Sequence, residues 1–212
     1  MHDNKFNNIK SYIRAPDGSE IMSAESLKIL GFHFNSRPNA NHHVSIVIEK
    51  FFARLWTLRF LKRSGMDSEN LLFVFKSIIR PMVEYSSVIY GPLIPKYMSD
   101  QLESAQRQAM KIIYGNGMDM DSLISSGKIE LLEDRRKSSS LRFALKTLGN
   151  ARFAGRWFPK SKVLRQARPT TRRVYEERKC KTERARNNPI QYMIRQLNEH
   201  EIAEEESSNR AA

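Results

Sequence analysis

The residues from 28 to 115 constrain the fold more than any other stretch, because their apolar positions recur at helical spacing between strong helix-ending signals. The first segment follows a polar loop in which Asn39 or Asn41 is predicted to cap the helix, and it ends at Ser64-Gly65. A long first helix is therefore predicted. Its predicted inward face consists of Val44, Val47, Ile48, Phe51, Phe52, Leu55, Leu58 and Leu61.

A second helix is predicted after Asp67 or Ser68, either of which can cap it. Its apolar residues run almost all round the helix, which predicts the most buried element of the chain. Pro81 is expected to kink it, because proline lacks an N–H and clashes with the preceding turn. The apolar residues are Leu71, Leu72, Phe75, Ile78, Ile79, Met82 and Val83.

A third helix is predicted from Ser99 or Asp100 to Gly115, a short one around residues 121–124, and a longer one from about residue 129 to 148. The first three long helices are enough to enclose one core, so the predicted fold class is mainly α. The inward residues predicted for the third helix and the 129–148 helix are Leu102, Ala105, Ala109, Ile112 and Ile113, then Leu131, Leu132, Leu141, Ala144, Leu145 and Leu148.

The N-terminal part predicts a small β-hairpin or short sheet in front of the helices. Residues 9–14 alternate in polarity, residues 15–19 carry turn chemistry, and a return strand is predicted at Glu20 to Met22. Leu27 to Phe34 is predicted as one further strand with Leu30, Phe32 and Phe34 on one face. Gly31 in this strand indicates a close approach of another group to the backbone.

The charge is concentrated in the C-terminal third. The chain has a formal net charge of +13, and the window 135–186 contains 18 Lys or Arg residues and only three acids. This region is predicted to be partly disordered, with Trp157, Phe158 and Tyr175 as anchors. A basic excess interleaved with aromatic residues favours a nucleic-acid partner (RNA, DNA or a hybrid) over an anionic membrane surface or a merely solvated face.

No catalytic or metal-binding constellation is recognisable in the sequence. There is no adjacent pair of aspartates; Asp119 with Asp121, and Glu133 with Asp134, are better explained as helix caps and solvated surface. His33, His42 and His43 lack a cysteine or carboxylate at ligand spacing, so a structural role is favoured over a metal site. We therefore expect no catalytic residue, no metal, no cofactor and no small-molecule substrate.

Other features bear on the compartment. No run of about 18 apolar residues is present, and the N-terminal residues 1–10 contain no secretory h-region. The single Cys180 cannot form an internal disulfide. These features predict a protein without membrane spans in an intracellular compartment, either cytoplasmic or nuclear.

Several quoted segments together resemble the reverse transcriptases of non-LTR retrotransposons, the RNA-directed DNA polymerases of jockey-like mobile elements. They are KILGFHF (28–34), WTLRFLKRSG (56–65), LLFVFKSIIRPMVEYSSVIYGP (71–92), SDQLESAQRQAMKIIYG (99–115) and RARNNPIQYMIRQLN (184–198). The resemblance implies the end of the palm, the thumb and a C-terminal extension. It departs from the family at Tyr90, where many relatives carry tryptophan, and it implies a structural role for His42 or His43.

The resemblance implies a domain organisation. Residues 1–36 would form a palm-end β-hairpin, 37–149 a helical thumb-like domain, 150–187 a basic linker, 188–200 a short C-terminal helix and 201–212 a disordered tail. The intact family enzyme uses Mg²⁺ held by palm aspartates, which this sequence lacks, so the resemblance implies a fragment that is inactive by itself as a polymerase.

In this interpretation the thumb region grips template–primer nucleic acid through its phosphates. Two other functions stay open from the sequence: a stand-alone basic nucleic-acid-binding module, and a helical protein–protein adaptor that uses the face of Leu30, Phe32 and Phe34. The predicted nucleic-acid-binding residues are Arg54, Arg59, Lys62, Arg63, Arg107, Lys111, Arg172 and Arg173.

Overall fold

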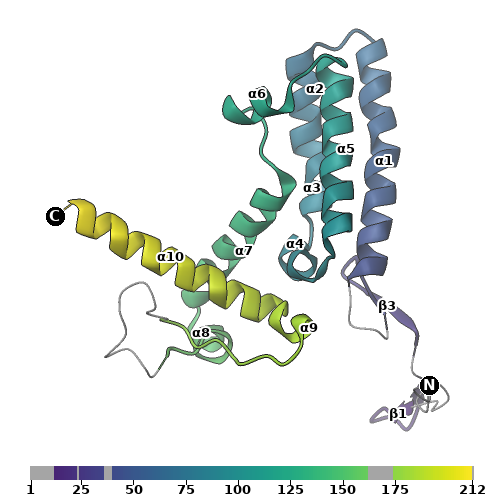
Figure 1. Cartoon of the computed structure of the whole chain (residues 1–212). Helices are drawn as coiled ribbons and strands as arrows, with labels where there is room; N and C mark the ends of the chain where they lie inside the picture. Colours follow the sequence, from purple (N-terminus) through teal and green to yellow (C-terminus); the bar gives the residue numbers. More distant parts are fainter. Residues whose placement is uncertain (1–11, 23, 36–39, 162–173, 212) are drawn as a thin grey trace, which may run out of the picture.

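The computed structural model describes residues 12–22, 24–35, 40–161 and 174–211. The described chain is mainly helical, with short antiparallel strands before a helical bundle, which confirms the predicted fold class. Figure 1 shows three upright columns of helix, formed by α1, by α2 with α3, and by α5, above a lower layer in which α10 crosses α7. Arg172 and Arg173 lie outside the described residues.

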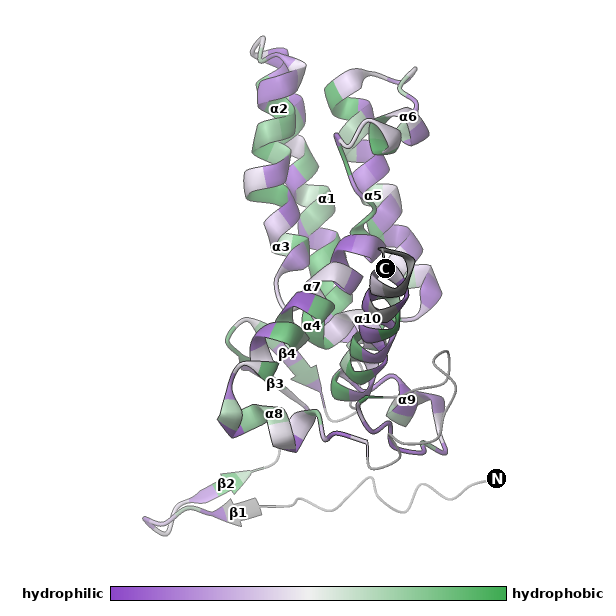
Figure 2. Cartoon of the chain, turned by 90° about the vertical axis from the view of Figure 1, so that its left-hand side faces the viewer, coloured by the Kyte–Doolittle hydropathy of each residue, from purple (hydrophilic) through white to green (hydrophobic). Residues whose placement is uncertain are grey.

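The strands form two separate hairpins. β1 (Tyr12–Arg14) pairs with β2 (Glu20–Met22), as predicted. The single strand predicted from residue 27 to 34 is wrong, because β3 (Ser26–Ile29) turns back and pairs with β4 (Phe32–Asn35). Figure 2 shows the β1–β2 hairpin lying apart from the helices.

The turn between β3 and β4 consists of two residues with positive φ, 48° at Leu30 and 82° at Gly31. Such a two-residue turn reverses the chain, so Leu30 does not lie on the face of β4 that Phe32 and Phe34 share, where their ring centroids are 4.6 Å apart. Leu30 is 86% exposed, whereas Phe32 is buried. The close approach predicted at Gly31 is confirmed, since a Cβ there would lie 3.4 Å from the ring of Tyr85.

Helix α1 (Asn41–Arg63) and helix α5 (Lys96–Tyr114) lie side by side with their C-terminal ends together. The predicted side-chain cap of α1 from Asn41 is wrong, because Asn41 is already the first helical residue and the cap position is Ala40; Asn39 lies outside the described residues. Helix α5 begins earlier than predicted, directly after Pro95. Proline suits this position because a helix start leaves backbone N–H groups unpaired in any case.

The predicted second helix is divided into several pieces. The order is α2 (Ser68–Val74), a π-helical turn η1 (Phe75–Ile79), α3 (Arg80–Glu84), α4 (Ser87–Tyr90) and the 3₁₀ turn η2 (Gly91–Leu93). The Asp67 cap is confirmed, since its carboxylate accepts from the backbone N–H groups of Glu69 and Asn70. The helix changes from α to π just before Pro81, and the Arg80 N–H there donates to the Phe75 carbonyl. This irregular turn lies where the predicted kink at Pro81 was expected.

This segment is buried on one side only, contrary to the all-round burial predicted. Leu71, Phe75, Ile79 and Val83 lie in the core. Ile78 is 64% exposed, so its predicted burial is wrong. The main core also takes in the buried residues of α1 and α5, together with Tyr90, whose hydroxyl donates to the Val83 carbonyl.

Helix α6 (Met120–Ser125) lies near the upper end of α5 and packs against the main core, and the lower layer consists of α7 (Leu132–Leu148), α8 (Ala151–Trp157), α9 (Glu183–Arg186) and α10 (Pro189–Ala211). On α7 the predicted inward residues Leu131 and Leu145 are exposed instead, at 36% and 40%. Helix α10 packs on α7, and it continues beyond the end predicted for it near residue 200.

A second hydrophobic cluster joins this layer to the basic region. The described parts of that region, residues 150–161 and 174–187, include helices α8 and α9, whereas the sequence predicted a partly disordered linker there. The cluster buries the predicted anchors Phe158 and Tyr175 against α7 and α10, with Trp157 half-buried beside them. No helix in the described residues has the length and apolar character needed to cross a membrane.

Candidate nucleic-acid interface

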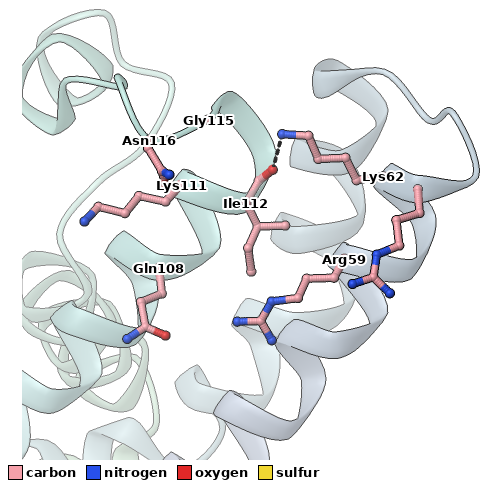
Figure 3. Close-up of a pocket in the computed structure, with 8 residues that line it drawn as sticks. Arg59, Lys62, Gln108, Lys111, Ile112, Gly115 and Asn116 are labelled. Atoms are coloured by element: carbon pink, nitrogen blue, oxygen red, sulfur yellow. Dashed lines mark hydrogen bonds between the residues drawn. The ribbon is translucent and has the colours of Figure 1, made fainter.

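An open groove of about 670 Å³ lies between the C-terminal ends of α1 and α5. Figure 3 shows Arg59 and Lys62 on α1 opposite Gln108 and Lys111 on α5. Four of its lining residues are cations and none is a carboxylate. The lining residues are Arg59, Lys62, Arg63, Gln108, Lys111, Ile112, Gly115 and Asn116.

The cations come together because both helices end at the same place. Arg59 and Arg63 are one turn apart on α1, and Lys111 lies in the last turn of α5. Each helix end carries a partial negative charge of roughly half an electron, which favours Lys and Arg there. Two such ends cancel roughly one of the four positive charges, so the groove stays positive.

Lys62 differs from the other three cations. Its Nζ donates to the carbonyl of Ile112 at 2.6 Å and to that of Ile113 at 3.2 Å (Figure 3). These carbonyls belong to the last turn of α5 and have no intrahelical partner there. Lys62 therefore ties α1 to the end of α5, and its ammonium is partly used for this purpose.

Arg59, Arg63 and Lys111 are exposed, and their charged groups make no hydrogen bond or ion pair with the described residues. Cationic groups without a protein partner can approach a phosphate without first breaking another contact. Arg54 and Arg107 are exposed on the same two helices but lie outside the groove. The structure thus brings together four of the eight residues predicted to bind nucleic acid.

An aromatic pair that the sequence analysis missed lies on an outer face of α1. The rings of Trp56 and Phe60 stack with centroids 5.4 Å apart, and the side chains are 62% and 52% exposed. Phe52, one turn earlier, is 37% exposed. The spacing of four residues from 52 to 56 to 60 is the signal that would have found this stripe, because such residues share one helix face.

The three histidines do come together at the start of α1. The ring centroid of His33 lies 5.8 Å from that of His42 and 6.1 Å from that of His43. No group of three or more His, Cys, Asp or Glu residues in the described parts has an arrangement that could hold a metal. His43 is buried and stacks on Phe32 with centroids 4.2 Å apart, which gives it a structural role.

Burial, and then the neighbouring His33, Lys50 and His42, lower the pKa of His43 to about 4. The backbone N–H of His33 donates to Nδ1 of His43 at 3.4 Å, so the neutral ring carries its proton on Nε2. This hydrogen is buried without a partner among the described residues. The ring is therefore held in the neutral form by its surroundings.

The carboxylates also take the structural roles assigned to them. Asp119 caps α6 by accepting from the N–H groups of Asp121 and Ser122. Glu133 lies in the first turn of α7 and forms an ion pair with Lys137, with 3.0 Å between Oε1 and Nζ. Neither arrangement resembles a pair of acids facing a substrate.

The fold and site together define a mainly helical protein with an open basic groove at one end of its bundle. Comparison of the chain with known protein families, curated proteins and solved structures gave no match.

Proposed function

We propose that this chain binds the phosphate backbone of nucleic acid in the groove between α1 and α5, as the thumb of a non-LTR retrotransposon reverse transcriptase grips its template–primer duplex. The observation that supports the proposal best is the set of unpaired cations Arg59, Arg63 and Lys111 around one groove without a lining carboxylate. Cations on two rigid helices present a preformed row of phosphate contacts. These contacts position a duplex but do not read its sequence.

The aromatic pair extends this surface. Trp56 and Phe60 lie on the same helix as Arg59 and Arg63 and expose their rings. Base stacking on such rings is worth about 1 to 3 kcal/mol per base and tolerates any sequence. A single-stranded end beside the gripped duplex therefore fits the Trp56–Phe60 face.

The proposed role is binding and not chemistry. The intact family enzyme needs aspartates that hold Mg²⁺ in its palm, and the sequence contains no adjacent aspartate pair. We expect no template-dependent nucleotide incorporation by this chain with Mg²⁺ or Mn²⁺. With a nucleic-acid partner, the proposed location is intracellular, in the cytoplasm or the nucleus.

Fluorescence anisotropy with a labelled RNA–DNA hybrid tests the groove. The double substitution R59E/R63E should weaken binding strongly at low salt and reduce the slope of log K against log [salt] by about 2, at roughly 0.9 per phosphate contact for B-form duplex. The matched control is K50E/K146E, which reverses two exposed charges outside the groove. If R59E/R63E binds like K50E/K146E, the groove is not the interface.

A stand-alone basic module predicts the same salt dependence, but no preference for a particular nucleic-acid form. The thumb proposal predicts tighter binding to the hybrid duplex than to either strand alone. Equal affinities for the three forms would favour the stand-alone module.

The adaptor alternative has a different observation in its favour. The two hairpins expose large apolar side chains, among them Ile21, Leu27 and Leu30. Exposed apolar groups on short strands can pair with another protein. The double substitution I21S/L30S should leave hybrid binding unchanged under the main proposal, and a loss of binding would show that the hairpins belong to the interface.

A further inference from the structure

A second pocket lies at the N-terminal end of α5, whereas the groove lies at the C-terminal end of this nineteen-residue helix, which is about 28 Å long. Its volume is about 320 Å³, and its walls come from η2, the N-terminal turn of α5, α7, Asn187 and α10. The residues that carry the argument are Lys96, Ser99, Arg136, Lys137, Ser140 and Arg195.

Arg136 is the unusual member of this pocket. Its side chain is buried, with the residue only 7% exposed, and its Nη2 donates to the Ser99 hydroxyl at 2.6 Å. Its Nη1 is buried without a hydrogen-bond partner, and no carboxylate in the described residues forms an ion pair with it. A guanidinium stays charged at any physiological pH, so an unpaired one inside a protein is strongly unfavourable unless an anion accompanies it.

The surrounding groups favour such an anion. Lys96, Lys137 and Arg195 also line the pocket, against one lining carboxylate, Glu133. Glu133 is engaged by Lys137 at 3.0 Å and lies 3.9 Å from the Lys96 ammonium, and its attraction to Arg136 is weaker than its attraction to either lysine.

Two of the lining cations have other partners as well. Lys96 pairs with Asp100 at 3.0 Å, and Arg195 donates to the Arg186 carbonyl at 2.8 Å. The positive excess in the pocket therefore depends most on Arg136.

Neutral donors complete the site. The hydroxyls of Ser99, Ser140 and Tyr192 line the same pocket. The α5 N-terminus also meets it, and the cap residue Pro95 offers no side chain to the unpaired N–H groups of the first turn. A helix N-terminus with a buried guanidinium beside it is suited to a doubly charged oxyanion.

We infer that this pocket binds a phosphate group, either free phosphate or the terminal phosphate of a nucleic acid. A phosphate has several oxygens that accept from donors on different sides, which matches the guanidinium, the hydroxyls and the helix end. Bound phosphate supplies the charge that Arg136 lacks and joins α5 to α7 and α10. The inference does not depend on nucleic-acid binding at the groove.

Isothermal titration of the full chain with inorganic phosphate, at constant ionic strength, tests the site. Wild-type protein should bind one phosphate, and R136M should bind it at least about tenfold more weakly, a difference of about 1.4 kcal/mol. The control is R142M, which makes the same change at an exposed arginine of α7 outside the pocket and should bind phosphate as the wild type does. A folded R136M with wild-type phosphate affinity would overturn the inference.

If R136M does not fold, S140A/K137Q decides the matter, because it removes one hydroxyl and one exposed ammonium from the pocket and keeps the hydrogen bond between Arg136 and Ser99. Its phosphate affinity should fall about threefold or more, and an unchanged affinity overturns the inference. Oligonucleotides with a 5′-phosphate or a 5′-hydroxyl, measured in the R59E/R63E background, then distinguish the two sources of phosphate. A preference for the 5′-phosphate assigns a nucleic-acid end, and equal binding assigns free phosphate.

Discussion

The two hydrophobic clusters of this protein are held together by different means. The main cluster of α1, the 68–90 segment and α5 is almost wholly apolar, and large side chains such as Phe51, Phe75 and Ile79 fill it. The second cluster is smaller and includes polar side chains that bind distant backbone. In it, Asn198 accepts from the N–H of Tyr175 at 2.9 Å and donates to the carbonyl of the same residue at 3.1 Å.

This difference separates the cluster that the local sequence pattern can predict from the cluster that depends on contacts between distant residues. Apolar residues at helical spacing identify their own helix face, whatever lies against it. A hydrogen bond between residues 175 and 198 has no counterpart in the periodicity of either segment. The comparison predicts that the main cluster responds most to loss of volume and the second cluster to loss of polar contacts.

The largest effect is expected in the main cluster. Ile79 is 1% exposed, so I79A should lower the free energy of unfolding by about 2 to 5 kcal/mol through lost burial and the cavity left behind. I78A is the matched control, because it makes the same chemical change at the preceding, exposed position and should stay within about 0.5 kcal/mol. Urea denaturation measures both. Similar losses in the two variants would mean that the 68–90 segment is not buried on one side.

His43 is a titratable side chain buried against the otherwise apolar main cluster, so its contribution to the free energy of unfolding depends on pH. Because its folded pKa is lowered to about 4, the unfolded chain takes up a proton first as the pH falls through about 6.5. The neutral ring therefore contributes its full stabilisation above about pH 6.5. This contribution decreases as the pH falls from about 6.5 to about 4, and the free energy of unfolding falls by at most about 3 kcal/mol over this range.

Urea denaturation at several pH values checks this loss. H43F should remove most of the dependence between pH 6.5 and 4, whereas H42Q, a change at the exposed neighbouring residue, should keep it. A slope that survives in H43F would assign the dependence to other groups, of which His33 is the first, since its pKa is also lowered by burial.

A smaller effect is expected in the second cluster. N198A leaves the buried N–H and carbonyl of Tyr175 without their partner, which should cost about 1 to 3 kcal/mol. E199A, an exposed change on the same helix, serves as the control. Hydrogen exchange should show the loss in α8 and α10 first, with α1 and α5 still protected. A uniform loss of protection would mean that the two clusters unfold as one unit.

Much of the main cluster was predictable from the sequence. The helix spacing of α1, the Asp67 cap and the buried position of Ile79 all follow from local pattern. The β3–β4 hairpin was not predicted, because its turn uses Leu30 at positive φ and lacks the usual Asn-Gly or Asp-Gly signal. Ile78 was misplaced because an apolar residue at a helix surface looks the same in the sequence as one in the core.

The sites at the two ends of α5 also differ in how far the sequence predicts them. Arg59, Lys62 and Arg63 were predicted from their crowding on one helix, and the groove between the helix ends then brought Lys111 beside them. The burial of Arg136 depends on packing among α5, α7 and α10, so the sequence shows it only as one more basic residue.

Long-range capping is hidden from the sequence in the same way. Glu103 on α5 accepts from the backbone N–H groups of Leu132 and Glu133 and thereby caps α7, thirty residues away. No capping residue stands at the start of α7 itself, where the cap position is Leu131. A local search for Ser, Thr, Asp or Asn before the helix therefore finds nothing.

The smallest predicted effect separates two neighbouring cations in the groove. Lys62 bonds the last carbonyls of α5, whereas Arg63 makes no polar contact with the described residues through its side chain. K62M should lower the free energy of unfolding by about 0.5 to 1 kcal/mol, because the Ile112 carbonyl loses its partner, the Ile113 carbonyl keeps only the Ser68 hydroxyl, and the helix dipole loses a nearby cation. R63M removes the same charge one residue later and should leave stability within about 0.5 kcal/mol.

Hybrid binding should rank the two variants the other way round. R63M removes a cation that is free to contact a phosphate, whereas the Lys62 ammonium is partly used by the carbonyls of Ile112 and Ile113. R63M should therefore reduce affinity at low salt more than K62M does, although K62M is the less stable protein. If both variants lose the same affinity and the same stability, the groove acts only through its total charge, and the position of each cation at the helix ends has no separate role.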